Sequence, residues 1–240
     1  ENQDAVNQLF KLLRHKDIIL RLEASKALNH IKNKDPKLRF SKKRIIRRLL
    51  SECKMYQDTL TAMSLQKHIS AKYDTLNTLQ EEIDEYAARQ SLIDLLERRL
   101  DNGLEQIFQL LGLRYKQKDI KIAYEGIISD RQDMQANAIE FLDTLLTPNL
   151  KSTLLPLVEN TTLVAAAEPM DSLDNFPSEI ECFRKLLKGR DLKIKLAVLY
   201  LLQHLRDPNY LKLVKPLIKH HNPKIKTFAN NALEKLAKIR

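Results

Sequence analysis

Apolar residues recur at helical spacing and divide the chain into a series of helices. In residues 12–31, LLRHKDIILRLEASKALNHI, two apolar stretches flank a polar break that contains Asp17. Apolar residues at positions i, i+4 and i+7 line one face of the helix that follows the break. Such a pair of helices cannot bury its apolar face alone. The pattern therefore predicts helical hairpins that stack and share one core.

The same pattern returns twice near the C-terminus and once, more weakly, in the middle. Residues 186–205 and 217–236 align with 12–31, and the weaker copy at 126–145 has Gln135 where the others have a cation. The aligned break holds a residue that can cap the second helix: Asp17, Asp191 or Asn222. Four residues later stands a cation that we expect to reach back toward carbonyl groups or a neighbouring repeat's Asp: Arg21, Lys195 or Lys226.

The distribution of prolines distinguishes a helical middle region from a predicted loop. Residues 37–147 contain no proline, so we expect about three long helices there, inserted between hairpins. Residues 160–179 contain Pro169, Pro177 and several acids, and we expect a long loop that binds a partner or is disordered. Pro156 and Pro216 are expected inside the first helices of hairpins.

Composition narrows the fold class and excludes common enzymes. Four Gly, no Trp and 6% aromatic residues leave little material for sheets, which predicts an all-α protein. Four isolated glycines cannot build a phosphate-binding loop or a dinucleotide turn. No nucleophile and base, and no pair of carboxylates, stand at a recognisable spacing. We therefore expect no catalytic residues and no cofactor.

No metal site is expected either. An acidic run is interpreted as a solvated face, because neighbouring side chains on a helix point in different directions. His220 and His221 are expected at the end of a helix, near its negative dipole end. Cys53 and Cys182 are expected as small core residues with reduced thiols, in a cytosolic setting. The members of the acidic run are Glu81, Glu82, Asp84 and Glu85.

Positive charge gathers at both ends of a chain whose net charge is +10. Its densest part is FSKKRIIRRLL, residues 40–50. On a helix over 41–53, one predicted face is apolar and another is cationic. The apolar face comprises Ile46, Leu49, Leu50 and Cys53. We predict Arg44, Arg47 and Arg48 as contacts for an anionic partner, supported by Lys42 and Lys43; the alternative is a solvated face without a partner.

Three segments give the chain its resemblance to a known repeat family. RHKDIILRLEASKAL, GRDLKIKLAVLYLL and HHNPKIKTFANNAL resemble HEAT repeats, which form curved α-solenoids that act as scaffolds. Residues 104–159, and ANAIEFLDTLL within them, are similar to the HEAT region of bacterial proteins in which an ATP:ADP antiporter or major-facilitator membrane domain is fused to such repeats. The longest dense apolar run has seven residues, too few for a membrane span.

These observations predict one right-handed α-solenoid domain over residues 1–240. It comprises HEAT-like repeats at 4–36, 118–160, 178–206 and 208–240, long helices at 41–117 and a loop at 160–179. The resemblance implies a non-catalytic, cytoplasmic scaffold for a protein partner, as a module of a larger transporter-like protein tethered to the inner membrane through a segment outside this chain. A scaffold that faces anionic lipid and an enzyme of unknown kind remain alternatives.

Binding to a phosphate backbone is the principal alternative function. Small basic arrays of HEAT-like repeats also occur in bacterial alkylpurine DNA glycosylases, and Arg44, Arg47 and Arg48 are placed to contact phosphates. Those enzymes press a Trp against the damaged base, whereas this chain has no Trp. Nucleic acid is therefore a less favoured partner than protein.

Overall fold

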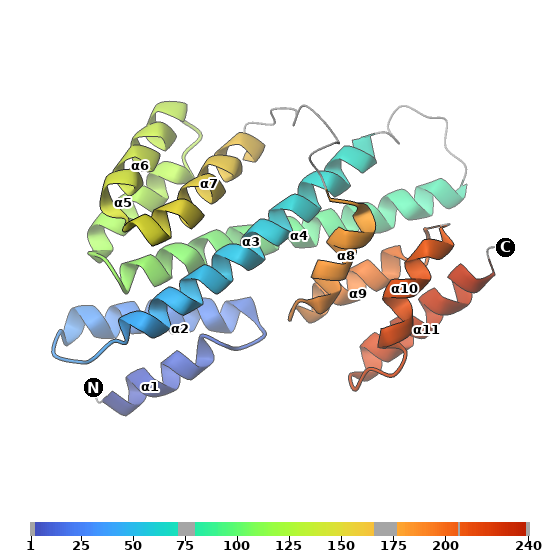
Figure 1. Cartoon of the computed structure of the whole chain (residues 1–240), viewed down its shortest axis with the longest axis horizontal. Helices are drawn as coiled ribbons and strands as arrows, with labels where there is room; N and C mark the ends of the chain where they lie inside the picture. Colours follow the sequence, from blue (N-terminus) through green and yellow to red (C-terminus); the bar gives the residue numbers. More distant parts are fainter. Residues whose placement is uncertain (1–2, 72–79, 166–176, 206, 239–240) are drawn as a thin grey trace. The chain divides into compact units, whose positions relative to one another are not determined.

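The computed structural model describes residues 3–71, 80–165, 177–205 and 207–238. Within these ranges all regular structure is helical (Figure 1), which confirms the all-α prediction. The α-helices are α1 (Gln3–Leu12), α2 (Ile18–Lys34), α3 (Lys42–Ala71), α4 (Gln80–Gly112), α5 (Gln117–Ile127), α6 (Gln132–Leu145), α7 (Pro148–Ala165), α8 (Glu179–Lys188), α9 (Leu192–Leu201), α10 (Leu211–Val214) and α11 (Pro223–Ala237).

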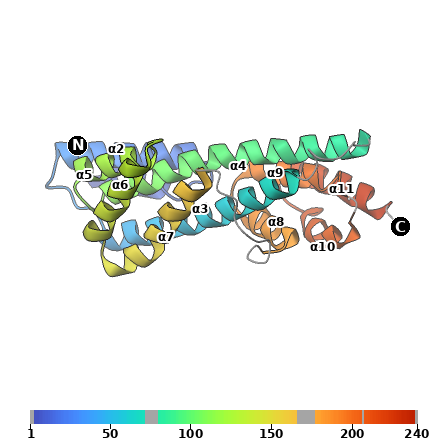
Figure 2. The same cartoon turned by 90° about the horizontal axis from the view of Figure 1, so that it is seen from above.

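Two compact units share the chain, and each takes part of the two long helices. Unit 1 comprises Glu1–Gln57 and Leu100–Asp171, and unit 2 comprises Asp58–Arg99 and Ser172–Arg240. The 30 residues of α3 and the 33 of α4 contribute to both units (Figure 2). In the described part of the predicted middle region, 41–117, two long helices occur where about three were expected.

Unit 1 joins the α1–α2 hairpin and the α5–α6–α7 helices to the start of α3 and the end of α4. Its core includes Val6, Leu28, Leu49 and Ile107, each almost fully buried. A side chain from α2 caps the C-terminal end of α4. The Lys32 ammonium donates to the carbonyl oxygens of Gly112, Leu113 and Tyr115 at 2.9–3.2 Å. This cation satisfies carbonyl groups that the helix itself leaves open.

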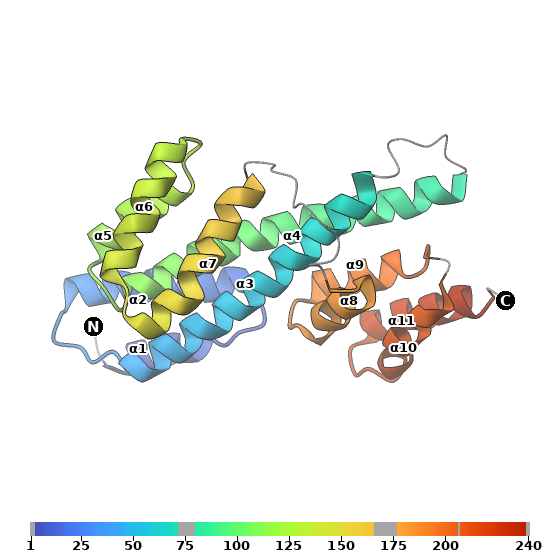
Figure 3. The ribbon, with the colours of Figure 1, turned by 45° about the horizontal axis from the view of Figure 1, so that its top comes forward.

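Unit 2 packs the α8–α9 hairpin and the α10–α11 segment with the end of α3 and the start of α4. Helices α9 and α11 lie side by side, and both run in the same direction (Figures 1 and 3). Val198 and Leu202 at the end of α9, and Ala229 and Ala232 in α11, are fully buried. Small residues in α11 let the helices pack closely.

The predicted caps form in three repeats. The Asp17 carboxylate accepts from the Ile19 N–H, and the Asp191 carboxylate accepts from the N–H groups of Lys193 and Ile194. The Asn222 side chain does the same at the start of α11. In the weaker copy Gln135 donates to the Ser129 carbonyl at 2.7 Å, six residues back. Arg21 makes the same kind of contact, with the carbonyl six residues before it, whereas among the described residues the side chains of Lys195 and Lys226 do not reach back as expected.

Two proline-based expectations need correction. Helix α7 continues to Ala165, so residues 160–165 of the predicted loop are helical, while residues 166–176 lie outside the described part of the chain. In this part of α7 the Thr161 hydroxyl donates to the Leu157 carbonyl, four residues back. Pro156 lies inside α7 as predicted. Pro216 instead lies in a 3₁₀ turn, Lys215–Leu217, because its ring nitrogen cannot donate to a continued α-helix.

We expect Asp191→Ala to destabilise the protein by about 1 kcal/mol, because two N–H groups at the start of α9 lose their acceptor. Asp191→Asn is the matched control, since Asn222 caps the equivalent helix. Urea unfolding followed by circular dichroism measures both. Equal losses from the two variants would show that the charge of Asp191 matters and its capping bonds do not.

Candidate cationic interaction site

The chain between α2 and α3 is held against α1 by a set of specific contacts. The Gln3 side chain donates to the Arg39 carbonyl at 3.0 Å and accepts from the Arg39 N–H at 2.9 Å. The Phe40 ring lies 6.2 Å from the Phe10 ring, and the Arg44 guanidinium lies over Phe10, 4.7 Å from the ring centre. These contacts fix the backbone just before α3 and at its first turn.

This fixed segment carries a dense group of exposed cations. Lys42, Lys43, Arg44 and Arg47 are exposed, as predicted for contact residues. Two further exposed cations precede them, and we call the set the cationic corner: Lys37, Arg39, Lys42, Lys43, Arg44 and Arg47. No carboxylate of the described residues forms an ion pair with any of them. Residues 36–51 contain no acid at all.

Arg48 differs from the other predicted contact residues. Its side chain is only 10% exposed, and its Nε donates to Glu52 Oε1 at 3.0 Å. The predicted apolar face is confirmed at Leu49 and Cys53, whereas Ile46 is only half-buried and Leu50 is wrong. Leu50 is 37% exposed, whereas Ile45 is buried with Leu49 and Cys53. The buried face of α3 follows positions 45, 49 and 53, so the helix is rotated relative to the prediction.

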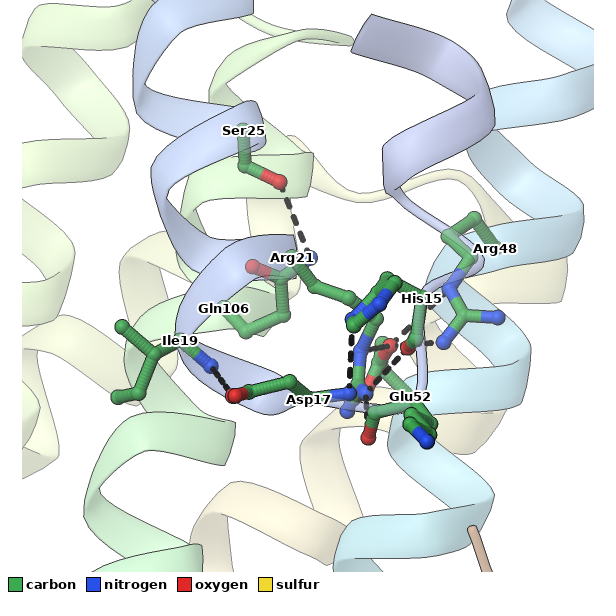
Figure 4. A network of polar contacts seen from close by, with 9 residues as sticks. His15, Asp17, Ile19, Arg21, Ser25, Arg48, Glu52 and Gln106 are labelled. Carbon is green, nitrogen blue, oxygen red and sulfur yellow. Dashed lines mark hydrogen bonds and ion pairs between the residues drawn. The ribbon is translucent and has the colours of Figure 1, made fainter. Parts of the chain in front are cut away.

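A buried network of charged side chains sets this rotation (Figure 4). Glu52 and Arg21 are almost fully buried, and the Arg21 Nε lies 2.8 Å from Glu52 Oε1. Arg21 also donates to the carbonyl oxygens of His15 and Lys16 at 2.9 and 3.1 Å. The α1–α2 turn and α3 are therefore joined through one guanidinium. Reach toward the carbonyl groups was predicted for Arg21, but the pairing with Glu52 was missed.

A signal for Glu52 does exist in the sequence. It is the first acid after a run of seven cations in residues 37–48, and it lies one turn from Leu49 on the buried face. A lone carboxylate on an apolar face needs a cation that is buried with it. The repeat pattern places such a cation at Arg21, although only the tertiary packing brings the two together.

Unit 2 contains a second buried network, centred on Arg89 and Glu179. The Arg89 guanidinium contacts Glu179 and Gln66, and it donates to Glu85 at 2.6 Å. The Tyr210 hydroxyl also donates to Glu179, and burial together with that carboxylate raises the pKa of Tyr210. Glu85, a member of the predicted acidic run, thus forms part of an internal ion pair. The side chains of Glu81 and Glu82 lie outside the described residues.

The two cysteines and His220 are held by packing and hydrogen bonds within the protein. Burial is the main cause that raises the pKa of Cys53 to about 12 and that of Cys182 to about 11, so both thiols are core residues as predicted. His220 lies just before α11, and its Nδ1 accepts from the Asn222 N–H at 3.0 Å. The helix that was expected to end at His220 is replaced by the four residues of α10 and a 3₁₀ turn that ends at Leu217. No three His, Cys, Asp or Glu side chains in the described ranges form a group that could hold a metal ion.

None of the helices described here has the length and apolarity required to cross a membrane. Comparisons of the chain with protein-family models, with curated proteins and with solved structures find no match.

We expect Glu52→Gln to lower the free energy of unfolding by about 3–5 kcal/mol, because Arg21 is then buried without a countercharge. Glu105→Gln is the control, because it removes the partly exposed pair with Lys26 and should cost at most about 1 kcal/mol. Urea unfolding compares the two variants. A loss of similar size in both would mean that the buried pair contributes no more than a surface pair.

Proposed function

We propose that this protein is a non-catalytic interaction scaffold that binds an acidic surface of a protein partner through the cationic corner. The observation that carries the proposal is the group of six exposed cations without a carboxylate partner among the described residues. Like charges at close range repel one another and reduce the stability of the folded chain. A partner that supplies carboxylates relieves that repulsion on binding.

Charge on several other helices is arranged differently. An exposed cation there has an acid one turn away or on a neighbouring helix, as in Lys121–Glu125, Lys238–Glu234 and Lys67–Glu97. A face that serves only solubility usually mixes both signs in this way. The corner departs from that arrangement over eleven consecutive residues, 37–47. This contrast supports a binding role over a simple solvated face.

Side-chain chemistry favours carboxylates as the ligand groups. Arg39 and Arg47 present planar guanidinium groups, which bind carboxylates through two parallel hydrogen bonds. The first turn of α3 adds flexible ammonium groups from Lys42 and Lys43. The fixed backbone at Arg39 reduces the conformational entropy that binding would otherwise cost. A phosphate backbone has related chemistry and is distinguished by experiment.

We further propose that the hairpins stack as a right-handed α-solenoid of the HEAT type, with α3 and α4 as inserted long helices. Equivalent caps at the starts of α2, α9 and α11 support this assignment. The likeness of residues 104–159 to transporter-fused repeats supports a place as a cytoplasmic module of a larger membrane protein. In that arrangement the scaffold would present its corner to a protein at the cytosolic face.

Arg44→Glu/Arg47→Glu tests the proposal. With fluorescent polyglutamate as the probe, we expect its affinity to fall about tenfold or more, because reversal removes two attractions and adds two repulsions of about 0.5–1 kcal/mol each. Fluorescence anisotropy at low and physiological salt measures binding, and thermal melting checks the fold. Arg47→Glu alone keeps the Arg44–Phe10 contact and should show a smaller loss with an unchanged melting temperature.

Lys116→Glu/Lys118→Glu is the matched control, since these exposed lysines at the start of α5 give the same change in net charge within unit 1. It should bind polyglutamate almost as the unaltered protein does. An equal loss in this control would refute a specific role for the corner. Tighter binding to a short DNA duplex than to polyglutamate, with a steep dependence on salt, would instead favour the phosphate-backbone alternative.

A further inference from the structure

A second concentration of positive charge lies in unit 2, where α9 and α11 begin. Residues 188–233 contain ten Lys and Arg but only two acids, Asp191 and Asp207. Seven of the cations lie in or just before the first turns of the two helices. One is Arg190, which has contacts of its own, and we call the other six the lysine edge: Lys188, Lys193, Lys195, Lys219, Lys224 and Lys226.

The repeat places these lysines at equivalent positions on neighbouring helices. A shift of 31 residues aligns Asp191 with Asn222 and Lys193 with Lys224. Because α9 and α11 lie side by side and run in the same direction, their first turns occur at the same edge of unit 2 (Figures 1 and 3). Burial, and after it the charges of His221 and of Lys195 in α9, lower the pKa of His220 just before α11.

The two acids of this region are already engaged with backbone groups. Asp191 accepts from two N–H groups of α9, and Asp207 accepts from the Asn209 N–H. These two carboxylates therefore accept hydrogen bonds from backbone N–H groups at the helix starts. The exposed charge at this edge comes from the lysine ammonium groups. None of the six lysines has an ion-pair partner among the described residues.

The type of side chain separates this edge from the cationic corner. Lysine carries a compact, strongly hydrated charge on a flexible stem, without the planar fork that fits one carboxylate or phosphate. Lys193 and Lys224 are exposed on packed helices, whose axes lie about 8–10 Å apart. Long stems let such lysines reach a common plane. Such lysines fit a flat surface that carries many negative charges better than a single ligand of defined geometry.

We propose that the lysine edge docks unit 2 on a membrane surface that contains anionic lipid. Clusters of basic residues are attracted to such surfaces, and the attraction fades within a Debye length. In the first turns of α9 and α11, Ile194 and Ile225 are buried, and no exposed large apolar residue is found there. The contact is therefore electrostatic, without insertion into the hydrocarbon, and salt should reverse it.

Vesicle cosedimentation tests the proposal with the whole chain. The probes are vesicles of phosphatidylcholine alone and vesicles of equal parts phosphatidylcholine and phosphatidylserine. We expect binding to the second kind only, and its loss at high salt. Lys193→Glu/Lys224→Glu should weaken binding at least about tenfold, since each basic residue near the surface contributes about fivefold.

Two control variants test whether vesicle binding depends on the lysine edge or only on net charge. Lys212→Glu/Lys235→Glu makes the same change in net charge in α10 and at the far end of α11, and it should bind vesicles nearly as well as the unaltered protein. Arg44→Glu/Arg47→Glu should also retain binding, which separates this surface from the proposed protein site. The proposal is overturned by binding to neutral vesicles, by equal losses in the Lys212 control, or by a DNA duplex that binds where anionic vesicles do not.

Discussion

The buried pair of Arg21 and Glu52 is the contact on which the arrangement of unit 1 depends. A charge removed from water must be compensated at short range, because its desolvation otherwise costs several kcal/mol. Glu52 meets this requirement with Arg21 from α2 and Arg48 from its own helix. Arg21 in turn binds the carbonyl groups of the α1–α2 turn. One carboxylate thus sets how α3 is rotated against the hairpin.

That rotation decides which cations are available to a partner. With Glu52 turned inward, Ile45 and Leu49 are buried and Arg44 and Arg47 face outward. The contacts of Gln3 with Arg39 then hold the preceding backbone in place. Within about two turns of α3, the internal carboxylate is neutralised and the external cations are left without a carboxylate partner among the described residues. The exposure of these cations is therefore a consequence of the packing beneath them.

Unit 2 uses the same physical device with different residues. Glu179, in the first turn of α8, receives Arg89 from α4, Gln66 from α3 and the hydroxyl of Tyr210. Both networks connect a long helix to a hairpin through a carboxylate. In both, the cation is almost fully buried. Each unit thus has its own buried network and its own group of exposed cations.

Local features of this protein follow from its sequence alone. The helical class, the caps at Asp17, Asp191 and Asn222 and the buried cysteines depend on composition, spacing and nearest neighbours. Only the tertiary structure decided that Arg48 is held by Glu52, that Leu50 is exposed and that α7 extends to Ala165. Arg48 and Glu52 are only one turn apart, but Glu52 is also paired with Arg21, 31 residues away, and periodicity along one helix carries no information about such a distant partner.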